Sequence, residues 1–297
     1  MKAITELLDN HRRQHTLLGN ARKLVFKGVD GMDVYNTSIC FELGGQKMIA
    51  GRVEERGSEE SKTYLFKEID LDTFELIPNF FLSLQDPFIT VIDQNIILGG
   101  VQVDWTSPEN PVWRTEFYRI SDDLSPEFLF RGPEKMKDIR MVQLEDNRIL
   151  MLTRPQGGAA SAGKIGLLIG NGLNEFSEKQ IRNAPLVKNN YEDGTWGGAN
   201  QIIQVSKNVV KVIGHIAEKI DGELHYYSVS FLIDVPEQQI FNEHIIAERQ
   251  DFLAGPSKRD DLADVVFTSG INLDSAGKQW LLCGTSDCEE QYIELIE

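Results

Sequence analysis

The sequence is poor in cysteine, with only Cys40, Cys283 and Cys288 among 297 residues. Their number is odd and no two are spaced as CxxC, which argues against a disulfide framework and against a structural zinc site. A few unpaired cysteines are typical of proteins kept in a reducing compartment. We therefore predict a cytoplasmic protein without a bound metal.

Basic residues are also scarce, with 30 Lys and Arg against 46 Asp and Glu, a formal net charge of -16 and a pI of about 4.8. Phosphate backbones and anionic lipid repel such a chain, so we expect neither a nucleic-acid nor a membrane partner. No apolar run is long enough to cross a bilayer. Oligomeric state is not indicated by the sequence.

Residues 1–20 lack the apolar core of a signal peptide. Leu7, Leu8, Leu17 and Leu18 are spaced to share one helical face. We expect a short amphipathic helix over residues 1–20 that packs on the main domain.

The motifs of several enzyme classes are missing as well. The sequence has no Ser/His/Asp nucleophile elbow, no P-loop and no GxGxxG after a strand. We therefore expect no organic cofactor.

Short runs of Val, Ile, Leu, Phe and Tyr follow residue 20, separated by Gly, Asn, Asp and Pro. This pattern predicts an all-β protein, and 41% apolar residues suffice for one large β domain or two smaller ones. A unit of two strands joined by a polar turn recurs, beginning at Asp33, Asp86, Asp138, Gly197 and Asp264. Successive starts are 53, 52, 59 and 67 residues apart.

Further strands complete each unit. Third strands are predicted at 62–69, 114–120, 164–170, 225–233 and 291–297, and fourth strands at 74–81, 127–132, 238–246 and, less clearly, 178–183. Repeats of this length with four strands each predict a five-bladed β-propeller over residues 21–297. Residues 24–27, within the segment 22–28, are expected to close the ring as the outer strand of the last blade. A β-sandwich or two small β domains remain the alternatives.

In a propeller, the entrances of the inner strands crowd around one end of the central channel, where a polar pocket can form. Entrance positions are occupied by Asp33, Tyr35, Asn36, Gln85, Asp86, Lys137, Asp138, Trp196, Asn200 and Asp264. The ends of the second strands supply Arg52, Glu54, Asp104, Arg154, His215, Glu218 and Asp287. Such a mixture of acids, bases and an aromatic ring suits a sugar. Taken singly, each residue has a plainer interpretation: Asp86 before Pro87 can form a turn, Arg154 can lie on the surface and His215 can be a core histidine.

Several segments, in order, resemble glycoside hydrolase family 130, the mannoside phosphorylases and related mannosidases. They are VYNTSICFELGGQKMIAGRVEE, QDPFIT, KDIRMVQLEDNRILMLTRP, VVKVIGHIAE, YYSVSFLIDVPEQQI and DVVFTSGINLDSAGKQWLLCGTSD, and together they extend from about residue 30 to 297. The motifs are degenerate, so the chain resembles a distant branch of the family.

The resemblance implies a function. Asp86 matches the family's proton donor, and we expect a partly dry pocket to raise its pKa. Asn36, Arg52 and Asp287 match sugar-holding residues, and Trp196 is expected to cover the sugar ring. Arg154 and His215 match phosphate-holding residues, with Lys137 as another cation. The resemblance thus implies inverting phosphorolysis or hydrolysis of a small glycoside, above all a mannoside, with inorganic phosphate as a possible co-substrate.

Two departures keep alternatives open. Phe88 stands where the family has the arginine of its Asp-Pro-Arg triplet, and the segment GTWGGAN lacks an expected lysine and proline pair. Hydrolysis by water, or a sugar-binding or regulatory propeller without catalysis, is therefore an alternative. A third is a protein-interaction propeller, for which Trp105 and Trp113 are the candidate contacts, although a loop lining the substrate entrance suits them better.

Overall fold

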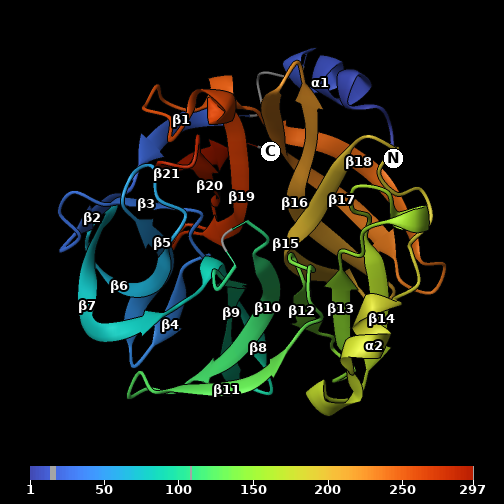
Figure 1. Cartoon of the computed structure of the whole chain (residues 1–297), viewed down its shortest axis with the longest axis horizontal. Helices are drawn as coiled ribbons and strands as arrows, with labels where there is room; N and C mark the ends of the chain where they lie inside the picture. Colours follow the sequence, from blue (N-terminus) through green and yellow to red (C-terminus); the bar gives the residue numbers. More distant parts are fainter. Residues whose placement is uncertain (14–17, 108, 297) are drawn as a thin grey trace.

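A computed structural model describes residues 1–13, 18–107 and 109–296. Strands dominate it, which confirms the predicted all-β class (Figure 1). Within the described part, the α-helices are α1 (Ile4–Arg13) and α2 (Glu178–Arg182). Single 3-10 turns occur at η2 (Gly158–Ala160), η3 (Leu173–Glu175), η4 (Arg249–Asp251) and η5 (Asp260–Leu262).

The strands fall into five antiparallel groups that follow one another along the chain. The first holds β3 (Asp33–Tyr35), β4 (Phe41–Leu43), β5 (Gln46–Glu54), β6 (Lys62–Asp70) and β7 (Thr73–Leu82). The second holds β8 (Gln85–Ile92), β9 (Asn95–Asp104), β10 (Val112–Ile120) and β11 (Pro126–Arg131). The third holds β12 (Arg140–Gln143), β13 (Ile149–Thr153) and β14 (Gly166–Gly170). The fourth holds β15 (Trp196–Ser206), β16 (Val209–Ile220), β17 (Glu223–Asp234) and β18 (Gln239–Ala247), and the fifth holds β19 (Asp264–Leu273), β20 (Gln279–Thr285) and β21 (Glu289–Leu295).

The groups are arranged around the middle of the molecule, as Figure 1 shows. Hydrogen bonds also join neighbouring groups, because β17 pairs with β19 and β21 pairs with β3, both in parallel. By hydrogen bonding, the described strands form one 14-stranded sheet, one 4-stranded sheet and one 3-stranded sheet. The inner strands β8, β12, β15 and β19 each lead away from a polar segment, and this places those segments near one another.

Two strands near the start of the chain correct the predicted closure. β1 (Leu18–Lys23) pairs antiparallel with β21 in the fifth group, with Leu18 opposite Leu295. β2 (Val25–Lys27) instead pairs in parallel with β7 of the first group. Of the expected segment 22–28, Arg22 and Lys23 do pair with β21, whereas the expectation that residues 24–27 form that outer strand was wrong. The apolar run LVF identifies a strand, but its pattern does not say which sheet edge it will join.

Helix α1 is shorter than the predicted helix of residues 1–20, because Leu18 already lies in a strand. Its apolar stripe is as expected: Ile4, Leu7 and Leu8 are buried in a core cluster with residues of the third and fourth groups. Leu17, which we expected on the same face, lies outside the described residues.

Residues 178–183, expected as a fourth strand of the third group, form helix α2 instead. Ser177 accepts a hydrogen bond from the backbone of Gln180, and the Gln180 side chain accepts one from the backbone of Ser177. This capping box satisfies two donors at the helix start, and Ile181 anchors the helix in the core. The spacing Ser-x-x-Gln indicates a helix start, and here it was a better guide than the weak strand pattern of residues 178–183.

All three cysteines are free, and Cys283 and Cys288 are buried. Among the described residues, no helix has the length and apolar character that a bilayer crossing requires.

Candidate active site

Four predicted site residues share an uncommon backbone conformation. Asn36, Asp86, Asp138 and Asp287 have φ values of 46°, 48°, 59° and 51°. Asn and Asp enter this left-handed region more readily than other side chains, but still at some cost. Exposed turn residues such as Asp93 and Asn147 share this conformation, so the four positions are distinguished by their burial and contacts and not by φ alone.

Asp86 lies at the start of β8 and is 7% exposed. Its Oδ1 accepts a hydrogen bond of 2.8 Å from Asn36 Nδ2 and one of 3.1 Å from Arg52 Nη1. Three residues that the sequence places in two different repeat units therefore meet here. Asn36 Oδ1 is buried without a hydrogen-bond partner in the described structure, and it faces Gly284, where a Cβ would lie 2.0 Å from it.

Behind Asp86, Arg52 is fixed by a buried acid. Arg52 Nη2 donates to Glu54 Oε2 at 3.0 Å, and the guanidinium lies over the ring of Tyr35. Glu54 also accepts hydrogen bonds from the Tyr35 hydroxyl and from Lys258 Nζ. Because every member of this network is bonded, Arg52 is held rigidly against Asp86.

The pKa of Asp86 differs from the expectation. Burial raises it, but the positive charges of Arg52 and Lys137 and the hydrogen bonds from Asn36 and Arg52 outweigh burial, so the net pKa is lowered. The predicted upward shift was wrong because the pocket around Asp86 is dry and also cationic. Asp86 is consequently a carboxylate at neutral pH.

Asp287 is the contrasting carboxyl group. It is half-buried, and no described residue donates a hydrogen bond to its carboxylate. Burial raises the pKa of Asp287 to about 6, because the opposing attraction of Arg52 is weaker. Two carboxyl groups whose pKa values are pushed apart are a common arrangement in acid–base catalysis.

A second cluster is built on Asp138, which is 2% exposed. Arg154 Nη1 donates to Asp138 Oδ2, and His215 Nε2 lies 3.8 Å from the same oxygen. Burial raises the pKa of Asp138, but Arg154, His215, Lys137 and Arg140 lower it by more. Arg154 Nε is buried and has no partner among the described residues.

His215 is held between polar and aromatic neighbours. Its Nδ1 forms a hydrogen bond of 2.8 Å with Asn200 Oδ1, and its ring stacks on Tyr226 with centroids 5.7 Å apart. Burial lowers the pKa of His215 to about 3, and the nearby cations contribute to the shift. His215 is therefore a neutral imidazole that can offer a ligand a hydrogen bond but no charge.

Lys137 is half-buried and acts on both clusters, because its charge lowers the pKa values of Asp86 and Asp138. No carboxylate of the described chain lies within ion-pair distance of its Nζ. The cationic groups near Asp138 outnumber the carboxylate, so this half of the site is locally positive in a strongly acidic protein. Such a surplus suits a small anion.

Trp196 forms part of an aromatic wall. Its Nε1 donates to the Tyr226 hydroxyl at 3.1 Å, and the two rings meet edge to face. Tyr226 in turn stacks on His215, which also contacts Phe267. Trp105, predicted at the substrate entrance, lines a cavity of about 590 Å³ that reaches Glu54.

The two sequence departures have structural reasons. The Phe88 ring is buried between the second and third strand groups, where it packs on Phe117, and a Cβ at Gly99 would lie 2.1 Å from it. Arg140 covers the ring at 3.8 Å from its centroid, so a cation lies beside Phe88 although none occupies its position. In GTWGGAN, a Cβ at Gly198 would lie 2.8 Å from the Asp138 Cβ, so this glycine lets Asp138 approach.

Some residues of the site were not selected from the sequence. Asp138 and Asn200 were identified as entrance positions of the repeat but were given no role there. Lys258 lies in the loop before β19, where no periodic pattern marks it. Tyr226 is one of two adjacent tyrosines, and only the strand register shows that it faces Trp196.

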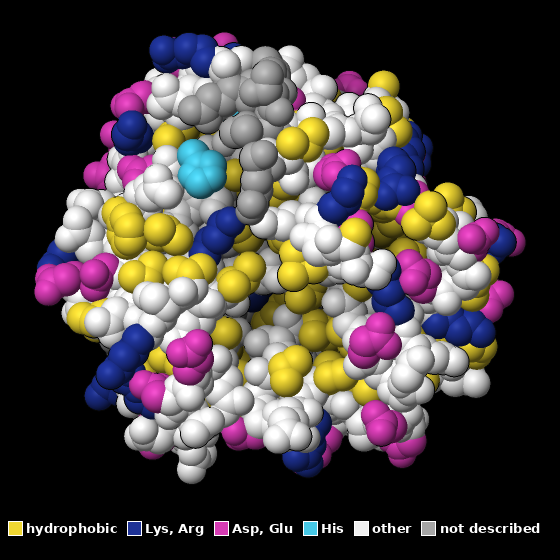
Figure 2. Space-filling model, turned by 180° about the vertical axis from the view of Figure 1, so that it is seen from behind, with side chains coloured by type: hydrophobic (Ala, Val, Ile, Leu, Met, Phe, Trp, Pro, Cys, Tyr) yellow, Lys and Arg dark blue, Asp and Glu magenta, His cyan; other side chains and the backbone are white. Residues whose placement is uncertain are grey.

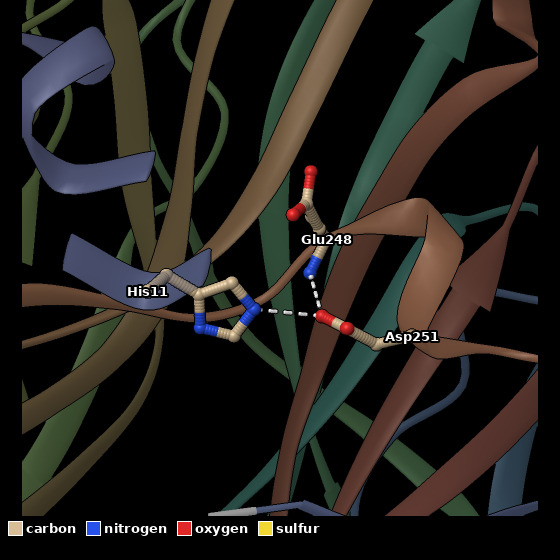
Figure 3. A group of neighbouring side chains, drawn as sticks. All are labelled: His11, Glu248 and Asp251. Atoms are coloured by element: carbon tan, nitrogen blue, oxygen red, sulfur yellow. Dashed lines mark hydrogen bonds and ion pairs between the residues drawn. The ribbon is translucent and has the colours of Figure 1, made fainter. Parts of the chain in front are cut away.

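A separate group could hold a metal ion by its composition: His11, Glu248 and Asp251 (Figure 3). His11 Nε2 lies 2.8 Å from Asp251 Oδ2, which also accepts from the Glu248 backbone. Arg12 donates to both carboxylate oxygens of Glu248. These contacts attach helix α1 to the segment that follows β18, and this structural role explains the group without a metal ion.

We compared the chain with protein-family profiles, curated proteins and solved structures. The sequence profile of a family described as "Protein of unknown function (DUF1861)" matches residues 10–297. No curated protein matches the chain.

Among solved structures, a mannose phosphorylase from Leishmania mexicana (MPT-4), in complex with phosphate, is 32% identical with a TM-score of 0.87, covering 97% of this chain and 94% of its own. A GDP-Man-dependent mannosyltransferase from Leishmania mexicana (MPT-1) is 26% identical with a TM-score of 0.88, covering 99% and 94%.

A β-1,2-mannobiose phosphorylase from Listeria innocua is 14% identical with a TM-score of 0.66, covering 90% of this chain and 91% of its own. At that identity the likeness concerns the fold alone. A structure from glycoside hydrolase family 130 is similar at the same level, with 12% identity and a TM-score of 0.63. The predicted resemblance to family 130 is confirmed as a resemblance of fold.

Proposed function

The chain belongs to the DUF1861 family, and from this premise we propose that it is a carbohydrate-active enzyme that transfers a mannosyl group between phosphate and a small sugar acceptor. The observation that carries the proposal is a buried carboxylate, Asp86, held between Asn36 and Arg52 beside a cationic cluster around Arg154 and Lys137. Its likeness to a mannose phosphorylase solved with phosphate supports the choice of both substrates. We also interpret the strand groups as a five-bladed propeller over residues 21–297, in the cytoplasm.

Phosphate would occupy the cationic half of the site. Lys137 Nζ makes no ion pair in the described structure and can donate to phosphate oxygens, and the Arg154 guanidinium supplies a second positive charge. His215 would add a neutral hydrogen bond. The missing fourth-group lysine is then compensated by Lys137, which belongs to the third repeat.

The sugar would lie on the other half. The carboxylate of Asp287 can accept hydrogen bonds from hydroxyl groups, and we assign Asn36 and Arg52, whose side chains hold Asp86, to the same sugar subsite. Trp196 would cover the ring, as aromatic side chains do for apolar sugar faces.

The lowered pKa of Asp86 suits the synthetic direction. In that direction, the carboxylate of Asp86 takes the proton of an acceptor hydroxyl, directly or through a sugar hydroxyl, as the acceptor oxygen attacks the anomeric carbon and phosphate leaves with inversion. In phosphorolysis, the bound phosphate dianion raises the proton affinity of Asp86, because a like charge disfavours the ionised form. Asp86 can then return the proton to the departing oxygen as general acid.

The test is to supply mannose 1-phosphate with small sugar acceptors and to measure phosphate release. Asp86→Asn should lower kcat at least about a hundredfold, the usual contribution of general acid–base catalysis. Asp93→Asn is a matched control, because Asp93 directly follows β8, the strand that contains Asp86, has a φ of 49° against 48° for Asp86, and is exposed. Equal activity of the two variants would show that Asp86 does not act as the acid–base group.

A second assay decides whether water or phosphate is the attacking group. Cleavage of a mannobiose in phosphate-free buffer would identify a hydrolase. Saturable mannose binding by calorimetry without turnover of any donor would instead support the sugar-binding alternative. The burial of Phe88 away from the Asp86 cluster argues against that alternative, because the departure leaves the partners of Asp86 in place.

A further inference from the structure

A second cavity, of about 500 Å³, lies farther along the same inner strands, beyond the candidate active site. Figure 2 shows a hollow in the middle of one face with hydrophobic side chains inside it. The cavity is lined by Ile39, Cys40, Phe41, Glu42, Phe88, Ile89, Thr90, Val91, Ile96, Arg140, Met141, Val142, Asn200, Gln201 and Ile202. Its volume falls within the range of small-molecule sites, and most of its lining is apolar.

One buried cation belongs to this lining. Arg140 is 3% exposed and donates through Nε to the Asn200 carbonyl at 3.2 Å and through Nη1 to the Ile139 carbonyl at 3.2 Å. Among the residues that the structure describes, none bonds to its Nη2, and no carboxylate lies within ion-pair distance. Arg140 therefore reaches the cavity with a donor to spare.

Keeping a guanidinium dry without an acid beside it is costly. Burial lowers the pKa of Arg140 to about 10, and the more distant charges of Asp138 and Asp86 oppose that shift only in part. The carboxylate in the cavity lining, Glu42, is exposed to solvent and makes no ion pair with Arg140. A ligand anion at Arg140 would supply the missing partner.

We propose that this cavity binds a small amphipathic carboxylate, whose head group pairs with Arg140 and whose apolar body covers Phe41, Val91 and Ile202. A flat carboxylate matches a guanidinium in geometry and charge. An apolar body is required because the cavity walls beyond Arg140 offer few donors. Because ten of the fifteen lining residues are apolar, we expect the ligand to differ from the sugar and phosphate substrates of the active site.

The two sites share one residue. Asn200 accepts from Arg140 through its backbone carbonyl and bonds to His215 Nδ1 through its side chain. A bound anion would also reduce the positive field that Arg140 exerts on Asp138 and Asp86. Resting on the proposed function, we expect the ligand to raise the KM for phosphate about fivefold, at the lower end of measured couplings.

Binding is tested without any substrate, by calorimetric titration of the full chain with decanoate below its micelle concentration and with 1-decanol as the uncharged comparison. Decanoate should bind saturably and at least about tenfold more tightly than decanol, the difference that one charge-assisted hydrogen bond provides. Arg140→Met should abolish this preference. No saturable binding of decanoate, or equal binding of decanol, would overturn the proposal.

A second pair of variants decides the question if Arg140→Met does not fold. Val91 and Val205 are both valines of inner strands, 52% and 51% exposed, but of the two only Val91 lines the cavity. Val91→Asp should weaken decanoate binding at least fivefold by repulsion, while Val205→Asp should leave it unchanged. Equal affinities would contradict the site. Because these readouts need no turnover, a failed activity assay leaves them intact.

Discussion

Replacing Arg154 should lower the free energy of unfolding, because Asp138 would lose its buried ion-pair partner. Its side chain is 5% exposed and that of Asp138 is 2% exposed, so Arg154→Met would leave a carboxylate dry. His215, at 3.8 Å, could compensate only by binding a proton, which its burial disfavours. For the Arg154–Asp138 pair, taken as unit charges about 4 Å apart, an attraction of about 4 kcal/mol is lost at an effective dielectric constant of 20, in line with the roughly 3–5 kcal/mol measured when one partner of a buried pair is deleted.

Urea and thermal unfolding would measure this loss. Arg148→Met is the matched control, because Arg148 pairs with Asp146 in the same strand group with both side chains 43% exposed, and such pairs contribute about 0–1 kcal/mol. The double variant Arg154→Met, Asp138→Asn should regain about 2 kcal/mol or more relative to Arg154→Met, because it removes the unpaired charge. The reasoning is refuted if Arg154→Met costs no more than Arg148→Met, or if the double variant regains nothing.

Three further outcomes are expected. Lys137→Met should raise the KM for phosphate about tenfold or more without lowering the melting temperature, whereas exposed Lys135→Met should change neither. With the pKa of Asp287 at about 6, kcat/KM should fall below pH 6 as this carboxylate, which we propose holds the sugar, is protonated, and a profile of Asp287→Asn without that limb would check the assignment. Burial raises the pKa of Glu290 to about 8, above its unfolded value, so its stabilising contribution is complete at low pH and is lost as pH rises through 8. Glu290→Gln should thus gain stability relative to the wild type between pH 5 and 9 by up to a few kcal/mol, while exposed Glu223→Gln should show no such trend; parallel curves for wild type and Glu290→Gln would contradict it.

Much of the fold was predictable because strand alternation and polar turns recur along the chain. The repeat placed Asn36 and Asp86 at inner-strand entrances and Arg52 at the end of a second strand, and the structure brings the three into contact. The pKa values of the site residues could not be predicted from the sequence. The pKa of Asp86 depends on how closely Arg52 and Lys137 approach it, and no spacing in the sequence encodes those distances.

Elements at the margins were predicted least well. Residues 178–183 have a composition compatible with a strand, and the capping box of Ser177 and Gln180 decided for a helix. Lys258 reaches Glu54 from a loop with no repeat counterpart, 204 residues away along the chain. Contacts of this kind are fixed by tertiary packing, which a local pattern does not contain.

The pairing of β1 with β21 has a consequence for synthesis. Leu18 and Leu295 are partners 277 residues apart, so at roughly 5–20 residues per second β1 waits on the order of 15–60 s on the ribosome before its partner exists. An apolar strand left unpaired for that time would invite aggregation. Its sequence, LGNARK, contains Asn20, Arg22 and Lys23. Because β1 is polar, it was not recognised as a strand from the sequence. The same polarity keeps the unpaired strand soluble until β21 has been synthesised.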